Sequence, residues 1–199
     1  MKKVVVYLGI GLIWLVSLLP LSIAQAMGDF IGWLLWVTKS NTARISMLNF
    51  RHCFPDYDDD KINKEVKQSL RSLGKSYTEM GMSWMWRIPK VHKLITQVEG
   101  EEHLQEALNN DNGIIIIAPH LGNWEILNHF FRTYLFMTVM YKPAKIPALD
   151  KFILDTRKRV DVGLVPADRS GVMSLFKILE NKGVVAVLPD QQPSRKSGV

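Results

Sequence analysis

A histidine and a glutamate stand five positions apart in the stretch IIIIAPHLGNWE, and their types suit acid–base chemistry. On one continuous helix, residues five apart are rotated by about 140° and lie on different faces. His120 and Glu125 can therefore act together only if His120 lies in a loop and Glu125 in the first turn of the following helix. Gly122 makes such a bend sterically easy, because glycine adopts backbone conformations that other residues avoid.

Such a pair can activate a hydroxyl group near neutral pH. A neutral imidazole removes the proton when a carboxylate fixes its tautomer and stabilises the imidazolium that forms. The attacking hydroxyl then belongs to the substrate, so the protein needs no nucleophile of its own. His120 is thus a candidate base, and Glu125 is its candidate partner.

Two other interpretations of these residues remain open at this point. His120 can be a structural loop histidine, while Glu125 pairs with His129 or Arg132 at helical spacing on an exposed face. Alternatively, His120, Glu125 and His129 can bind zinc, although their spacing is not the HExxH pattern of a zinc-binding helix.

Strands and helices alternate through the second half of the sequence. The four isoleucines at 114–117 are typical of a strand covered on both faces. We expect strands at 113–118, 136–142, 162–166 and 184–189, and helices at 123–133, 147–160 and 170–181. This order predicts an α/β fold with a largely parallel sheet flanked by helices.

Ligands usually bind beyond the carboxyl ends of the strands in such sheets. Several polar side chains follow the expected strands at that place: His120, Lys142, Asp168, Arg169 and Asp190.

The N-terminal segment is apolar enough for a membrane helix. Residues 4–21 carry no charge, and after Pro20 a second apolar segment covers 30–37, so we expect a retained N-terminal membrane anchor. A cleaved secretory signal is the alternative, because Ala24-Gln25-Ala26 resembles a cleavage site. The basic residues after the apolar segments, Lys39, Arg44 and Arg51, slightly outnumber those before them, Lys2 and Lys3. This asymmetry favours an orientation with the rest of the chain in the cytoplasm.

A helical section is expected between the anchor and the first strand, with helices at 40–53, from the acidic run at 58–60 through 84, and at 101–109. The second of these carries an amphipathic stripe that predicts packing against a core or a membrane: Ile62, Val66, Leu70, Leu73, Tyr77, Met80 and Trp84. The chain is thus expected to divide into an anchor (1–38), a helical section (39–110) and an α/β core (111–199).

Composition narrows the classes of site and partner. With 199 residues, of which 47% are hydrophobic, the chain is long enough to bury a core. Its single cysteine, Cys53, excludes an internal disulfide and a CxxC site. The net charge of +6 favours anionic lipids, phosphates or acidic proteins as partners, but no aromatic-interleaved basic motif indicates nucleic acid.

Several blocks together resemble the bacterial lipid A biosynthesis acyltransferases, the lauroyl and myristoyl transferases of the inner membrane. The string PHLGNWE places His120 and Glu125 at the two positions of that family's histidine-x4-acidic motif. Further blocks agree in order along nearly the whole chain: NFRHCFPDY, YKPAKIPALDKFILDTR, ADRSGVMSLFKILENKG and VLPDQQPSRKSGV. Family members continue beyond the last block, so the end at Val199 predicts a C-terminal truncation.

The resemblance implies transfer of a fatty acyl group from acyl carrier protein to a hydroxyl of a lipid A precursor, on the cytoplasmic face of the bacterial inner membrane. It implies that His120 deprotonates this hydroxyl and that Glu125 orients the imidazole. Backbone N–H groups at Gly122 and Asn123, with the Asn123 side chain, are the expected donors to the thioester oxygen. No metal or organic cofactor is expected, because the thioester already carries the activation.

Basic residues are expected to bind the phosphates of the acceptor: Arg157, Arg169 and Lys142. Asp190 is expected to position Arg195, Lys196 or the substrate, or else to cap a turn. Two other functions remain as alternatives, namely a phospholipid acyltransferase that acts on glycerol phosphate and a non-catalytic, membrane-anchored protein that binds anionic lipid.

Overall fold

The computed structural model describes residues 2–190, which divide into two compact units. Gly9–Met85 form one unit, and the described residues from Trp86 onward form the other together with the first residues of the chain. The domain boundaries expected at residues 38 and 110 stay a prediction.

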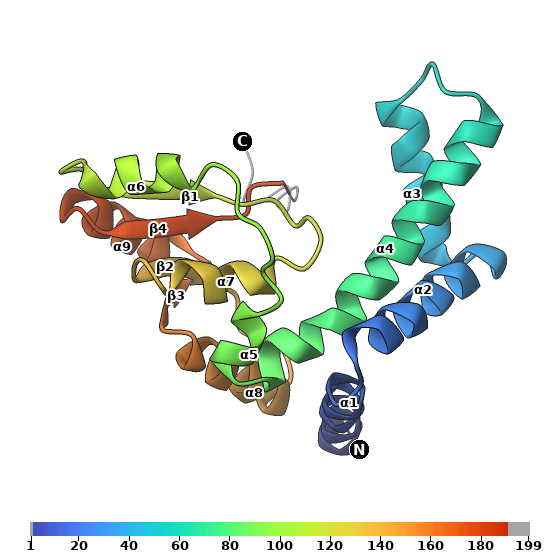
Figure 1. Ribbon diagram of the computed structural model, residues 1–199, viewed down its shortest axis with the longest axis horizontal. Coiled ribbons are helices and arrows are strands. Elements are labelled where there is room, and N and C mark those ends of the chain that lie inside the picture. The colour runs from blue at the N-terminus through green and yellow to red at the C-terminus, as the bar shows by residue number, and fades with distance from the viewer. Residues whose placement is uncertain (1, 191–199) are drawn as a thin grey trace. The chain divides into compact units, whose positions relative to one another are not determined.

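A parallel sheet forms the centre of the unit that follows Trp86 (Figure 1). Within the described residues it has four strands, in the spatial order β1-β4-β2-β3. They are β1 (Ile114–Ile117), β2 (Met137–Tyr141), β3 (Val162–Pro166) and β4 (Val184–Val187). The predicted α/β fold with a largely parallel sheet is confirmed.

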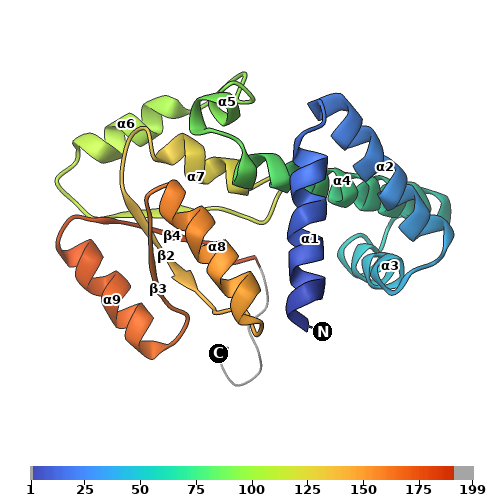
Figure 2. The same ribbon diagram turned by 90° about the horizontal axis from the view of Figure 1, so that it is seen from below.

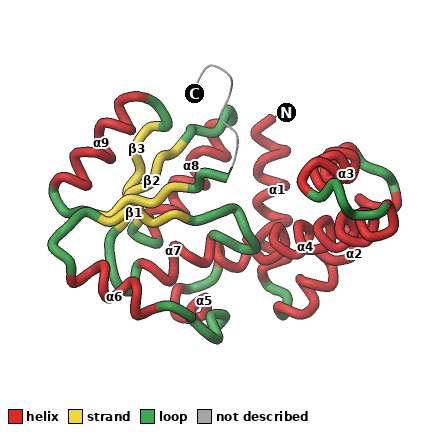
Figure 3. Tube along the Cα trace, turned by 90° about the horizontal axis from the view of Figure 1, so that it is seen from above, coloured by secondary structure: helices red, strands yellow, loops and turns green. Residues whose placement is uncertain are grey.

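The helices of this unit are α5 (Ile88–His92), α6 (Glu101–Asn109), α7 (Glu125–Phe131), α8 (Pro147–Arg159) and α9 (Arg169–Glu180). Helices α8 and α9 both pack against β3 (Figure 2), whereas α7 and α9 lie on opposite sides of the sheet (Figure 3). A proline in the first turn opens α8, as the sequence predicts, because its missing N–H has no helical partner there.

One face of the sheet carries the core of this unit. Met137, Val162, Val184 and Ala186 are buried there, and Phe131 packs against them. These residues share a face because side chains alternate along each strand and the strands are in parallel register.

The opposite face of β1 is open, so the expectation of a strand covered on both faces is wrong. Ile115 is 57% exposed and Ile117 is 70% exposed. The cause is the strand order, because β1 lies at an edge of the described sheet while α9 covers β2, β3 and β4.

The unit Gly9–Met85 is helical. It contains most of α1 (Lys2–Ser17), then α2 (Leu21–Val37), α3 (Asn41–Cys53) and α4 (Asp59–Met85). Within residues 2–190, no helix is by itself long and apolar enough to cross a bilayer, and α2 and α3 pass that test only as a pair bent by 80°. The N-terminal membrane helix therefore stays a prediction.

Helices α2 and α4 approach so closely that their backbones touch at glycines. A Cβ atom added to Gly28 would lie 2.5 Å from the carbonyl oxygen of Gly74, and one added to Gly32 would lie 2.2 Å from that of Leu70. Gly28 and Gly32 are four residues apart and therefore share one face of α2. The helix pair thus depends on the absence of side chains at this seam.

The buried stripe of α4 follows the same seam. It runs in four-residue steps through Ile62, Val66, Leu70, Gly74 and Thr78. The sequence suggested a path through Tyr77, but that side chain is 64% exposed. The stripe passes through Gly74 because only a glycine admits the backbone of α2 at this distance.

The glycine seam can be tested with one substitution at two places. We expect Gly32→Ala to lower the free energy of unfolding by about 1–3 kcal/mol, because the new methyl group overlaps the backbone of α4. Gly11→Ala in α1 is the matched control: nothing lies within 4 Å of its added Cβ, so we expect no loss and a gain of up to about 1 kcal/mol from helix propensity. Urea denaturation followed by circular dichroism measures the stability of both variants. Equal midpoints would show that close contact between α2 and α4 does not require glycine at position 32.

Candidate active site

A cavity of about 720 Å³ opens at the carboxyl ends of the strands. Much of its wall is apolar and comes from the core face of the sheet and from α7: Ile116, Leu127, Phe131, Met137, Val139 and Leu164. Three of the side chains singled out from the sequence also line it, namely His120, Lys142 and Arg157. An apolar cavity with a few ionisable groups is the usual form of a binding site for a small molecule or a lipid chain.

The carboxylate of Asp190 holds the imidazole of His120. The ring Nδ1 lies 2.8 Å from Oδ1 of Asp190, and the backbone N–H of His120 donates to Oδ2 at 2.8 Å. Because an ionised carboxylate only accepts hydrogen bonds, Nδ1 carries the proton and Nε2 is left as the basic nitrogen. The indole of Trp124 packs edge-on against the ring, with centroids 5.0 Å apart.

The pairing of β1 with β4 explains why these two residues meet. Ile117 lies opposite Val187 in parallel register, and the next N–H, that of Ala118, donates to the carbonyl of Val187 at 3.0 Å. His120 and Asp190 each come three residues after this pair, directly after a proline. Equal spacing from a paired position brings both to the same level beyond the sheet.

The contact with His120 also lowers the pKa of Asp190. Hydrogen bonds from the His120 side chain, and then from its backbone, hold the pKa of Asp190 below its ordinary value of 3.8. A lowered pKa in the folded state means that the contact stabilises the fold at every pH above that ordinary value. The contribution is lost only as the pH falls through the lowered pKa. Because this pKa lies below 3.8, Asp190 is ionised near neutral pH.

Glu125 lies in the first turn of α7, as predicted, but its partner is Arg157. Its side chain is 6% exposed; Oε1 accepts a hydrogen bond from Nη2 of Arg157 at 2.6 Å, and Oε2 accepts one from Asn128 at 3.3 Å. Within the described residues, the hydrogen bond of the His120 side chain goes to Asp190 and not to Glu125. The direct catalytic pairing of His120 with Glu125 stays a prediction.

The two alternative arrangements of Glu125 are not formed. The carboxylate is buried, and Arg132 instead donates to Asp161 at 2.7 Å, so Glu125 is not part of an exposed helical pair. In the part of the chain that the structure describes, no three His, Cys, Asp or Glu residues are arranged to hold a metal ion. This finding includes the trio His120, Glu125 and His129.

The loop that carries Lys142 is fixed by a carboxylate that the sequence did not point to. The hydroxyl of Tyr141 donates to Oδ1 of Asp150 at 2.5 Å, and the backbone N–H of Ala144 donates to the same oxygen at 2.7 Å. Burial, followed by the contact with Asp150, raises the pKa of Tyr141, so its phenol stays protonated as the donor. Asp150 thereby positions Lys142 at the cavity wall.

The remaining expected site residues, Asn123, Asp168 and Arg169, are not among the described residues that line this cavity. Asn123 is half-buried in the loop before α7, which begins only at Glu125, and its backbone carbonyl accepts the N–H of Ile126. Asp168 caps α9 by accepting the N–H groups of Ser170 and Gly171. Arg169 is exposed at the start of α9 and is not among the described residues that line the cavity. Contact of Asn123 or Arg169 with a substrate stays a prediction.

The sequence did not point to the contact of Asp190 with His120. The expected targets of Asp190, namely Arg195 and Lys196, lie outside the described residues. A signal was present, because APH follows the first strand and LPD follows the last, but its meaning depends on β1 and β4 being neighbours.

The ion pair of Glu125 and Arg157 predicts that two adjacent cations of α8, Arg157 and Lys158, contribute very differently to the free energy of unfolding. We expect Arg157→Met to lower the free energy of unfolding by about 3–5 kcal/mol, because it leaves the Glu125 carboxylate buried without its cation. Lys158→Met, at the next and exposed position, should change it by less than about 0.5 kcal/mol. Adding Glu125→Gln to Arg157→Met should recover part of the loss. Similar midpoints for the two single variants in urea denaturation would show that the pair has no structural role.

Comparison with known proteins covers the whole length of this sequence. Residues 1–199 match the family of bacterial lipid A biosynthesis acyltransferases. The lipid A biosynthesis lauroyltransferase of Escherichia coli K12 is 28% identical over 193 residues, which cover 97% of this chain and 62% of that protein. A lipid A biosynthesis acyltransferase of Haemophilus influenzae is 28% identical over 195 residues, covering 97% and 61%.

A third relative, the lipid A biosynthesis palmitoleoyltransferase of Escherichia coli K12, is 25% identical over 190 residues, covering 96% of this chain and 61% of that protein. The chain therefore spans about three fifths of the length of these relatives. The family match over all 199 residues shows that this chain belongs to the bacterial lipid A biosynthesis acyltransferases.

Proposed function

We propose that the protein transfers a fatty acyl group from the thioester of acyl carrier protein to a hydroxyl of a lipid A precursor, with His120 as the general base. One observation carries the proposal: in the wall of a largely apolar cavity, an imidazole has its Nδ1 held by Asp190, which leaves Nε2 basic. The apolar wall suits the acyl chain, and the basic nitrogen suits the hydroxyl that must be activated.

In this mechanism Nε2 of His120 takes the proton of the acceptor hydroxyl as its oxygen attacks the thioester carbonyl. The carbon–sulfur bond of the tetrahedral intermediate then breaks, and the imidazolium returns the proton to the leaving thiolate. Asp190 is a positioning residue, because its carboxylate fixes the tautomer of the ring and stabilises the imidazolium. Atoms and charge balance without a cofactor.

Glu125 acts in this proposal through Arg157. A guanidinium has five N–H donors, and the contact with Glu125 holds that of Arg157 in the cavity wall. Arg157 and Lys142 then provide positive charge for a phosphate of the acceptor. Direct assistance of His120 by Glu125 is the other form of the proposal, and it requires a rearrangement of the two side chains.

We further propose that the reaction takes place at the cytoplasmic face of the bacterial inner membrane. The support for a membrane is the N-terminal helix α1, which exposes large apolar side chains, among them Val5 (67%), Leu8 (69%) and Leu12 (62%). Such a surface is stable in lipid and costly in water. The support for the cytoplasmic side is the slight excess of basic residues after the apolar segments over those before them.

The base is tested by acyl transfer from labelled acyl carrier protein to a lipid A precursor. We expect His120→Gln to reduce kcat by about a hundredfold or more, because the hydroxyl then loses its proton acceptor. The exposed Lys177→Gln in α9 is the control and should retain the parent rate. If His120→Gln also retained it, the proposed chemistry would be wrong.

The partner of the base is tested with two carboxylate-to-amide variants. We expect Asp190→Asn to lower kcat at least about tenfold with little change in KM for the acceptor, because the imidazolium loses its counter-charge. We expect Glu125→Gln chiefly to raise KM for the acceptor, because the position of Arg157 becomes less well fixed. The reverse pattern would identify Glu125 as the partner of the ring.

A further inference from the structure

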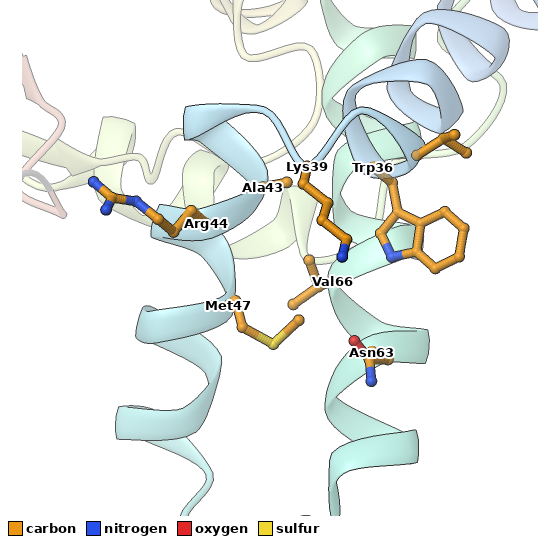
Figure 4. Close-up of a pocket in the computed structure, with 8 residues that line it drawn as sticks. Trp36, Lys39, Ala43, Arg44, Met47, Asn63 and Val66 are labelled. Atoms are coloured by element: carbon orange, nitrogen blue, oxygen red, sulfur yellow. The ribbon is translucent and has the colours of Figure 1, made fainter.

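The helical unit Gly9–Met85 contains a cavity of its own, which no step of the proposed reaction uses. It measures about 490 Å³ and lies where the end of α2 meets α3 and α4 (Figure 4). Its wall is largely apolar: Trp36, Val37, Ala43, Met47 and Val66. This size and character match sites that bind apolar ligands.

The charged groups at this cavity are cationic. Lys39 and Arg44 line it together with Asn63, and among the described residues no Asp or Glu does. The side chain of Lys39 extends into the space between α3 and α4 (Figure 4), and its backbone has a φ of 48°, which is unfavourable for lysine. Among the described residues, no carboxylate forms an ion pair with Lys39. Lys39 and Arg44 form the cationic rim of the cavity, and an anionic group would complement their charge.

The helices that form the cavity, α2, α3 and α4, also carry exposed apolar side chains and further cations. Ile31, Leu34, Val37, Ile45 and Leu48 on α2 and α3 are 44–60% exposed. The ammonium of Lys67 lies 4.8 Å from the ring centroid of Trp36. Lys67 also lines a second cavity together with Lys64. In that cavity Arg71 and Lys75 pair with Asp29, the only carboxylate among its described lining residues.

We propose that the cavity between α2, α3 and α4 receives an acyl chain of an anionic membrane phospholipid, with its phosphate bound by Lys39 and Arg44. An apolar pocket below a cationic rim, set in an apolar and basic surface, complements a lipid with one negative charge. An acidic protein would complement the cations but not the apolar pocket. The inference does not depend on acyl transfer, because no residue of the active-site cavity takes part.

The test measures which lipid touches Trp36. The full chain is reconstituted in phosphatidylcholine vesicles that contain a rising fraction of phosphatidylglycerol with brominated acyl chains, because bromine quenches indole fluorescence on contact. The chain has six tryptophans, so the contribution of Trp36 is the difference from a Trp36→Phe variant. A second series replaces the brominated phosphatidylglycerol by phosphatidylcholine with brominated acyl chains. We expect the fraction of brominated lipid at half-maximal quenching of Trp36 to be about tenfold lower for phosphatidylglycerol than for phosphatidylcholine.

Charge and shape are then varied separately. Lys39→Asn with Arg44→Gln should abolish the preference, and asparagine tolerates the positive φ at position 39. Lys93→Gln with Lys177→Gln removes the same charge from exposed positions of the other unit and should retain the preference. Ala43→Leu fills the cavity but keeps both cations, so it should lower the maximal quenching of Trp36. Circular dichroism checks that each variant is folded.

Several outcomes would overturn the proposal. They are equal quenching of Trp36 by the two brominated lipids, no quenching of Trp36 by either, and a preference that survives the loss of Lys39 and Arg44. A change in Trp36 emission that follows protein concentration and not lipid composition would also overturn it, because a second copy of the chain would then cover the site.

Discussion

The parallel pairing of β1 with β4 is the constraint on which the active-site geometry depends. Backbone hydrogen bonds fix Ile117 opposite Val187, and each strand continues through one apolar residue and a proline to an ionisable residue. A slip of one residue in this register would move the following side chains out of line and would reverse the faces of the strand. The position of the imidazole is therefore set by the sheet, and the contact of His120 with Asp190 completes it.

The buried pair of Glu125 and Arg157 serves a different purpose. Removing two charges from water costs more than many ion pairs return, so such a pair is a weak source of stability. It is better explained as a means of holding a guanidinium at the wall of an apolar cavity. The hydrogen bond from Asn128, one turn along α7, satisfies the second carboxylate oxygen and keeps the pair in one arrangement.

Much of the fold could be predicted from the sequence because local patterns determine it. Alternating apolar runs and helical segments gave the parallel α/β order, and the helix at 101–109 has the predicted bounds. The strand order could not be predicted, since β1 and β4 are neighbours in space but lie at opposite ends of the α/β segment. The position of His120 could be predicted because it follows from the end of the first strand. Its contact with Asp190, 70 residues away, could not, because it requires β1 and β4 to be neighbours. The path of the α4 stripe was missed because it depends on the glycines of α2.

The five-residue spacing of His120 and Glu125 has a physical explanation even though the two side chains have different partners. The loop places His120 beyond the sheet, where the carboxylate of Asp190 faces its ring, and α7 places Glu125 against the guanidinium of Arg157 in α8. Each of the two carboxylates therefore has its own partner. In the proposed reaction the proton of the hydroxyl arrives beside Asp190, so the new positive charge forms next to an existing negative one. The apolar cavity then needs no other group to compensate for protonation of the base.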